Sequence, residues 1–168
     1  GYGLPLSIVL FKPELDQWEP GEHNGTFRGN NLAFVTAAAS FSHFWVDNRF
    51  SQEIGRKAAM VKGTLTALCL ELSGHELSHR GRGLMQGLNC ARGDLAAAIA
   101  AECFRRGLII ETSGAHDEVL KILCPLTIEH ETLKEGLNIL TEAVRQVCQA
   151  VAPEPSEEDY FEGLRLVS

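Results

Sequence analysis

The feature that most constrains the fold is a long apolar stripe near the middle of the chain. Apolar side chains recur there at alternating spacings of four and three residues: Ile54, Ala58, Val61, Leu65, Leu68 and Leu72. This spacing places them on one face of an α-helix, and that face must pack against a core. Gly74 is expected to end the helix, close to a change in composition. We therefore predict that a helix over residues 51–73 links two structural units.

The residues before this helix predict one strand and one further helix. Residues 6–11 are rich in strand-forming side chains and stop before Pro13, which predicts a short, largely buried strand. Residues 32–46 are rich in alanine and predict a helix that packs closely against a neighbour.

The residues after Gly74 alternate between strand and helix patterns. Strands are predicted at residues 84–90, 108–110 and 119–124, and a helix is predicted to start at a cap formed by Asp94. A last amphipathic helix carries Leu133, Leu137, Leu140, Val144 and Val147. These elements predict an α+β unit over residues 74–152, with helices on one face of the strands. Residues 153–168 are acidic and predict a solvated tail.

Composition excludes several classes of protein. The 168 residues are enough for one globular core, and the net charge of -7 provides no basic field for a nucleic-acid partner. No apolar stretch approaches the length of a membrane span, so no membrane association is expected. The chain begins with Gly1 rather than Met and runs at once into an apolar segment. We therefore expect a piece of a longer polypeptide.

The cysteines indicate a reducing compartment. The chain has five of them, an odd number, and they are widely spaced without any C-x-x-C pair. This pattern supports neither a zinc knuckle nor a thioredoxin motif, and it predicts small buried side chains in a cytoplasmic protein. A catalytic cysteine stays open as an alternative, although none has evidently electropositive neighbours.

Residues 23–31 are the main candidate for a binding site. They combine Gly25 and Gly29, the Thr26 hydroxyl and the Arg28 guanidinium immediately before a predicted helix start. Glycine backbone N–H groups, a hydroxyl and a helix N-terminus capped by Asn30 or its neighbour can converge on a phosphate. The alternative is an ordinary surface turn, because Asn-Gly pairs usually mark one.

Three other features suggest chemistry less strongly. Residues 75–79 match the zinc-protease pattern H-E-x-x-H, but flanking glycines favour a polar loop over a rigid helix. Residues 80–83 favour a turn over a second anion site. Lys121 shares a strand face with Val119 and Leu123, so its charge must be paired, reach solvent at a sheet edge, or meet a ligand carboxylate. Of these three, the favoured interpretation is that Lys121 lies at a sheet edge, where its side chain reaches solvent.

Four segments together resemble the C-terminal half of a class III, pyridoxal-phosphate-dependent aminotransferase. They are residues 1–5, 23–30, 80–87 and 124–128. The resemblance implies an α/β protein of fold type I: the end of the large cofactor domain in residues 1–50, a linker helix in 51–73 and a small domain in 74–152. It also implies a homodimer that binds pyridoxal 5′-phosphate. Thr26 and Gly25 are then expected to bind the phosphate of the cofactor that belongs to the partner subunit.

The resemblance also implies a reaction. Residues 18–31 are similar to members that move an amino group from L-glutamate to L-aspartate 4-semialdehyde in ectoine biosynthesis. Lys121 stands where relatives carry an arginine for a substrate carboxylate. The family motif for the Schiff-base lysine is not found in these residues, so we expect no catalytic residue here and no activity from this chain by itself. The alternatives are another ω-aminotransferase, of the ornithine or acetylornithine type, and a non-catalytic dimerisation or binding module.

Overall fold

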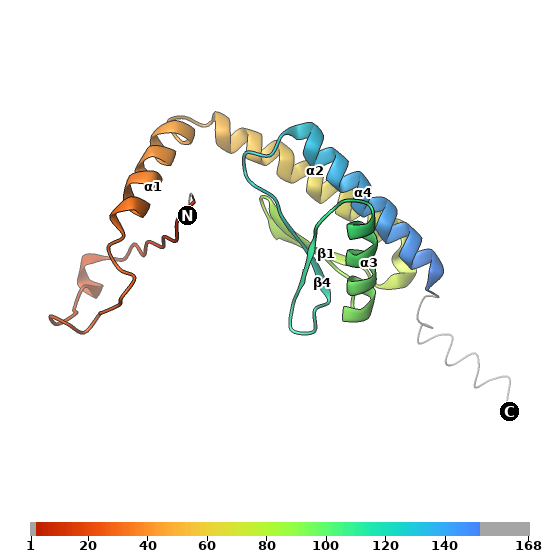
Figure 1. Ribbon diagram of the computed structural model, residues 1–168, viewed down its shortest axis with the longest axis horizontal. Coiled ribbons are helices and arrows are strands. Elements are labelled where there is room, and N and C mark those ends of the chain that lie inside the picture. Colours follow the sequence, from red (N-terminus) through yellow and green to blue (C-terminus); the bar gives the residue numbers. More distant parts are fainter. Residues whose placement is uncertain (1–2, 152–168) are drawn as a thin grey trace, which may run out of the picture. The chain divides into compact units, whose positions relative to one another are not determined.

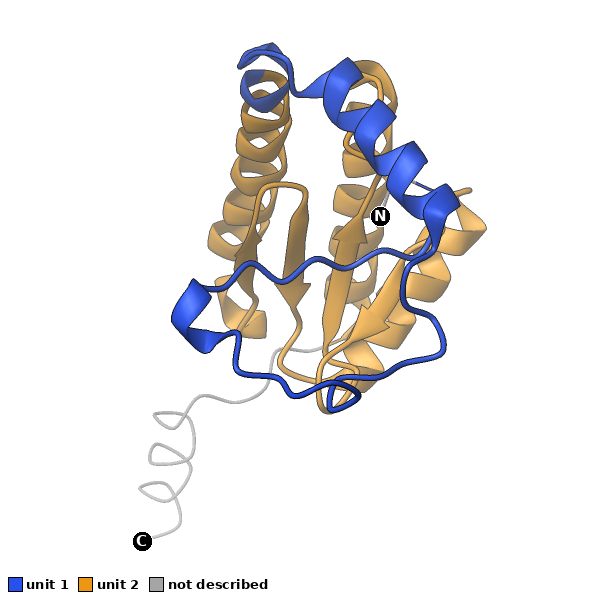
Figure 2. Ribbon diagram, turned by 90° about the vertical axis from the view of Figure 1, so that its left-hand side faces the viewer, with its two compact units in different colours: residues 1–52 blue, residues 53–168 orange. Residues whose placement is uncertain are grey.

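The structure, a computed structural model, describes residues 3–151 (Figure 1). The tail expected at residues 153–168 lies outside this range. The chain divides into two compact units, residues 1–52 and residues 53–168 (Figure 2). In the described part of the chain, no helix combines the length and the apolar character needed to cross a membrane.

The first unit contains a short 3-10 helix η1 (Pro13–Leu15), helix α1 (Asn31–Phe44) and the start of α2 (Arg49–Glu71). Asn30 is the N-cap of α1, and its side-chain oxygen accepts a hydrogen bond from the Ala33 N–H at 3.3 Å. Ala33 and Ala37 are the buried residues of this helix. The prediction of an alanine-rich helix with an asparagine cap is therefore confirmed.

The strand predicted at residues 6–11 does not form. This segment is extended, and Ile8, Val9 and Leu10 are 64%, 77% and 92% exposed. A strand needs hydrogen-bonding partners, and the described residues offer this segment none. The prediction was wrong because β propensity describes a side chain's preference and carries no information about a neighbouring strand.

The second unit is built on an antiparallel sheet of four strands. In spatial order these are β1 (Ser78–Arg82), β2 (Met85–Asn89), β4 (Val119–Leu123) and β3 (Glu111–Ser113). The helices of this unit are α2, α3 (Gly93–Arg105) and α4 (His130–Ala150), and a short 3-10 helix η2 (Ser73–His75) follows α2. Helices α2, α3 and α4 cover one face of the sheet (Figure 1, Figure 2).

The core lies between this face and the helices. Leu88 and Leu120 face each other across β2 and β4, and both are fully buried. Val61, Leu65 and Leu68 of α2 belong to the same cluster, which confirms the apolar stripe that the sequence predicts. The periodic stripe of α4 is confirmed in the same way, since its buried residues include Leu133, Leu137, Leu140 and Val144.

Polar contacts fix the helices to one another and to the sheet. Arg145 of α4 donates two hydrogen bonds of 2.7 Å to the Glu71 carboxylate at the end of α2. The Gln86 side chain is 5% exposed and donates to the Ala58 and Gly83 carbonyl oxygens at 3.0 and 2.7 Å. Gln86 thereby connects the β1–β2 hairpin to α2. Both of its side-chain amide protons have a partner, as a buried amide requires.

Three predictions about local structure in the second unit were wrong. Residues 80–83 do not simply form a turn, because Arg80 to Arg82 belong to strand β1, which no pattern in the sequence predicts. Only Gly83, with φ at +61°, takes part in the turn to β2. A positive φ at this position of the turn favours glycine.

The other two wrong predictions concern the start of α3 and the strand that follows this helix. Asp94 is not the cap of α3, because the helix begins at Gly93 and Arg92 is its N-cap. The strand predicted at residues 108–110 forms instead at Glu111–Ser113. The Leu108 N–H donates to the Cys103 carbonyl at 2.9 Å, so the helix end uses the backbone that a strand would need.

Replacing Leu120 tests the central position of β4. Leu120→Ala removes a side chain that is 0% exposed, and we expect it to lower the free energy of unfolding by about 2–5 kcal/mol. Leu123→Ala, on the same strand but 54% exposed, is the control and should cost less than about 1 kcal/mol. Urea denaturation of the purified protein measures both, and equal effects would contradict the described core.

Candidate functional site

The segment before α1 forms a turn that closes on itself. The Arg28 N–H donates to the Gly25 carbonyl at 3.3 Å, and the Arg28 guanidinium donates to the His23 carbonyl. Gly29 has φ at +69°, a conformation that favours glycine. A Cβ atom at position 25 would lie 3.4 Å from the Arg28 side chain, an ordinary van der Waals contact, so the Arg28 side chain packs directly against the backbone of Gly25.

Thr26 lies at the exposed tip of this turn. Its hydroxyl has no hydrogen-bond partner within residues 3–151 and is free to bind a ligand. The N-terminus of α1 follows, where the Asn30 side chain bonds only the Ala33 N–H of the first turn. The segment is thus a surface turn that also holds a free hydroxyl next to a glycine backbone and a helix start. This donor set suits phosphate oxygens.

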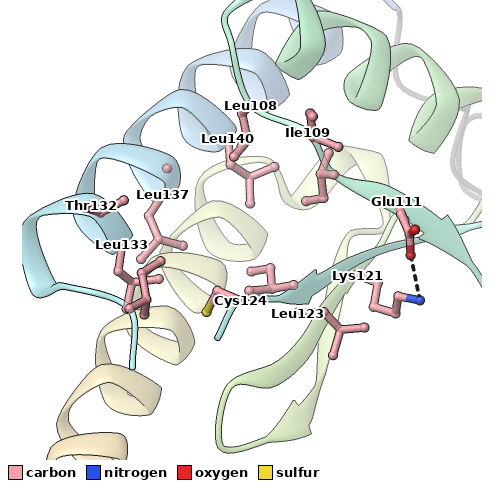
Figure 3. A pocket seen from close by; sticks show the side chains of 14 residues that line it. Leu108, Ile109, Glu111, Lys121, Leu123, Cys124, Thr132, Leu133, Leu137 and Leu140 are labelled. Atoms are coloured by element: carbon pink, nitrogen blue, oxygen red, sulfur yellow. Dashed lines mark ion pairs between the residues drawn. The ribbon is translucent and has the colours of Figure 1, made fainter. Parts of the chain in front are cut away.

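Lys121 is paired rather than placed at an edge. Strand β4 lies between β2 and β3, so the favoured edge position was wrong. The Lys121 Nζ lies 3.0 Å from Glu111 Oε2, and Glu111 is the residue directly opposite on β3 (Figure 3). The Lys121 side chain is 32% exposed, which leaves its ammonium group accessible to a second anion.

A cavity of about 510 Å³ adjoins this ion pair. Its wall between β4 and α4 is mostly apolar and includes Leu108, Ile109, Leu133, Leu137 and Leu140 (Figure 3). A substrate with several charges would find few partners on such a wall. The polar chemistry of this region therefore belongs to Lys121 and Glu111 rather than to the apolar part of the cavity.

The zinc-protease pattern at residues 75–79 has the wrong geometry for that role. His75 belongs to the 3-10 helix η2, whereas His79 lies on strand β1. Glu76 between them has φ at +52°, so the two histidines do not share a helical face. No group of three or more metal-ligating side chains occurs among the residues that the structure describes.

Two of the cysteines are poorly suited to act as a nucleophile. All five are free thiols, and Cys90, Cys103 and Cys148 are buried. Burial raises the pKa of the Cys90 thiol to about 12 and that of Cys103 to about 11, because the charged thiolate loses its hydration. The alternative of a catalytic cysteine thus has no support at these two positions.

The chain belongs to the class III aminotransferases, since residues 1–144 match the family described as Aminotransferase class-III. It is 54% identical over 140 residues to the diaminobutyrate--2-oxoglutarate transaminase of Vibrio cholerae. These matched residues are 83% of this chain and 34% of that protein. A protein of the same name from Halomonas elongata is 52% identical over 148 residues, which are 87% of this chain and 35% of the relative. This chain therefore spans about a third of the length of these relatives.

Solved structures agree with this assignment. The N-acetylornithine aminotransferase of Stenotrophomonas maltophilia matches with a TM-score of 0.61 at 25% identity, over 73% of this chain and 33% of that one. The family and this likeness confirm the fold class expected from the sequence, an α/β protein of fold type I. They also confirm pyridoxal 5′-phosphate as the cofactor that goes with the family.

Buried thiols should be chemically silent in the native protein. At pH 8, well below the raised pKa of Cys90 and Cys103, both groups stay protonated and shielded, so iodoacetamide should label them only after unfolding. The partly exposed Cys69 and Cys124 should react first. Peptide mass spectrometry of timed samples measures the order, and equally fast labelling of Cys90 and Cys69 would contradict the described burial.

Proposed function

We propose that this chain is part of an aminotransferase that moves an amino group from L-glutamate to L-aspartate 4-semialdehyde, giving L-2,4-diaminobutyrate and 2-oxoglutarate. The observation that carries the proposal is the identity of 54% and 52% to two proteins named diaminobutyrate--2-oxoglutarate transaminase. Substrates are assigned here to the complete enzyme, of which this chain represents a part.

The turn before α1 fits the phosphate of the cofactor. Thr26 has an accessible hydroxyl that no described residue uses, and Gly25 brings backbone close to it without a side chain. We assign both residues to the phosphate, which would be that of the partner subunit in a homodimer. When bound, pyridoxal phosphate supplies the ring that accepts electrons from the substrate, and the role of this turn is to hold and orient it.

A homodimer also agrees with the surface of the first unit. Its large apolar side chains include Leu10 at 92% exposed and Phe27 at 98% exposed. Exposed apolar surface of this kind is typical of a face that other protein covers.

The free thiols of all five cysteines support a cytoplasmic enzyme.

Lys121 is assigned to a substrate carboxylate. Its ammonium lies on a rigid central strand, and its ion pair with Glu111 holds it in place while leaving it accessible. A lysine binds a carboxylate as a point charge, whereas an arginine would form two parallel hydrogen bonds. We therefore expect Lys121 to contribute attraction without a fixed carboxylate orientation.

One other substrate is supported by a specific observation. The likeness in fold to an N-acetylornithine aminotransferase makes acetylornithine the second candidate for the amino donor. Both candidates carry a terminal ammonium, and they differ in charge at the α-nitrogen, which is an ammonium in diaminobutyrate and a neutral amide in N-acetylornithine.

Amino-donor assays of the complete enzyme decide between the two. With 2-oxoglutarate as acceptor, we expect kcat/KM for diaminobutyrate to exceed that for N-acetylornithine by at least about tenfold, because a site shaped for an α-ammonium must hold a bulkier, neutral acetamide in its place. Glutamate formation measured by coupled assay is the readout. A preference for N-acetylornithine would reject the proposed substrate, and a failure to form glutamate from either donor would reject the proposed reaction.

Changing Thr26 tests the phosphate turn. Thr26→Ala removes one hydrogen bond to a charged group, worth about 1.5–3 kcal/mol, so the Kd of the complete enzyme for pyridoxal phosphate should rise about tenfold to a hundredfold. Thr26→Ser keeps the hydroxyl and should bind nearly as the wild type does. Absorbance titration of the cofactor-free enzyme measures the Kd.

The matched control for this variant is Thr36→Ala. The Thr36 hydroxyl donates to the Ala33 carbonyl at 3.1 Å within α1, so its loss should leave cofactor binding unchanged. If Thr26→Ala and Thr36→Ala bind the cofactor with the same Kd, the assignment of Thr26 to the phosphate is wrong.

A further inference from the structure

The turn before α1 presents two neighbouring side chains. The Arg28 N–H donates to the Gly25 carbonyl three residues earlier, at 3.3 Å, so Thr26 and Phe27 are the two central residues of this turn. Both are exposed, and Phe27 is 98% exposed. The Arg28 guanidinium also donates to the His23 carbonyl, which closes the turn a second time. Thr26 and Phe27 are thus held in a fixed relation to each other at the tip.

Phe27 belongs to a larger apolar surface of the first unit. A hollow of about 1120 Å³ has several apolar side chains in its lining, among them Val9, Phe11, Trp18, Phe27 and Phe34. Helix α1 follows the turn and has no aspartate, glutamate, lysine or arginine in its 14 residues. Leu32 and Val35 of this helix are 70% and 67% exposed. A helix that is apolar on its exposed side as well is typical of one that other protein covers.

The position of Phe27 follows from that of Thr26. A hydroxyl that donates to a phosphate oxygen lies about 2.5–3.0 Å from it, and the Cα atoms of neighbouring residues are about 3.8 Å apart. If Thr26 binds the cofactor of the partner subunit, the phenylalanine ring on the next residue must therefore lie at the interface between the subunits. Aromatic side chains are enriched in the buried centre of such interfaces.

We propose that Phe27 is a positioning residue that packs into an apolar surface of the partner subunit and thereby fixes the Thr26 hydroxyl at the partner's cofactor phosphate. This inference rests on the proposed function, in which Thr26 binds that phosphate. Because the turn is closed at Gly25 and His23, fixing one of its two central side chains also orients the other. A change of Phe27 in one subunit then weakens the cofactor site of the other subunit.

The first test combines Phe27→Ala with Thr26→Ala in the complete enzyme. Phe27→Ala alone should raise the Kd for pyridoxal phosphate about three- to tenfold, because the hydroxyl remains but is less well placed. In the Thr26→Ala background, the same change should alter the Kd by less than about twofold, since the group that Phe27 positions is already gone. Additive effects would show that Phe27 does not act through Thr26. Phe27→Leu keeps an apolar side chain and should retain most of the wild-type affinity.

Phe104→Ala is the matched control. Phe104 is 69% exposed on α3 in the second unit, so the same substitution removes an exposed ring far along the chain from the turn. It should leave the Kd for the cofactor unchanged. Absorbance titration of the cofactor-free enzymes provides all of these values.

Mixed dimers test whether the effect crosses from one subunit to the other. Differently tagged subunits of the complete enzyme are paired so that one subunit has its Schiff-base lysine replaced by alanine, and only the other subunit's site can react. In the first dimer, Phe27→Ala is in the lysine-deficient subunit, whose turn serves the working site. In the second, Phe27→Ala is in the working subunit. The cofactor concentration for half-maximal activity should rise about three- to tenfold in the first dimer and stay at the unsubstituted value in the second.

The outcomes separate this inference from the proposed function. A rise in the second dimer, or an equal rise in both, overturns the inference because Phe27 then acts within its own subunit, and no rise in either dimer overturns it as well. Thr26→Ala in the same two arrangements tests the proposed function by itself. If Thr26→Ala acts in the first dimer and Phe27→Ala does not, only the inference fails. If Thr26→Ala has no effect in the first dimer, the assignment of Thr26 to the partner subunit's cofactor fails.

Discussion

The pairing of β2 with β4 is the contact on which the second unit depends. These two strands are the inner pair of the sheet, and each of the outer strands attaches to one of them. Their register places Leu88 opposite Leu120 and Gly87 opposite Lys121. Because side chains alternate between faces, a slip by one residue would move Lys121 into the core and the two leucines out of it. Burial of the leucines therefore fixes the position of the lysine, and core packing determines where the charge is presented.

The same alternation separates two kinds of surface in a small unit. The helix-covered face is closed by apolar contacts from α2, α3 and α4, while the other face carries the charged ends of Arg80, Lys121 and Glu111. A charge on a central strand would cost several kcal/mol if it were buried without a partner. The Glu111 carboxylate, directly opposite on β3, removes that cost without removing access to the ammonium group. The ion pair explains how a lysine is tolerated on an inner strand.

Sequence patterns predicted the parts of this fold that depend on one segment at a time. The stripes of α2 and α4 and the Asn30 cap require only local spacing, and the structure has all three. The patterns failed where a segment depends on another. Residues 6–11 have strand-forming side chains but no described partner, whereas β1 has almost no apolar side chains and forms because β2 lies beside it. The edge position predicted for Lys121 failed for the same reason, since the addition of β3 is a pairing that no spacing within β4 encodes.

The overall charge of the chain gives the local cations a particular role. A net charge of -7 repels anions at long range, so the field of this part of the protein does not attract them. The groups among the described residues that can contact an anion are therefore local ones, such as the exposed Thr26 hydroxyl and the accessible ammonium group of Lys121. Such contacts depend strongly on the position and number of acceptor groups, whereas a broad basic surface attracts any anion. An acidic chain that holds one lysine on an inner strand therefore presents a local contact for an anion instead of a broad basic surface.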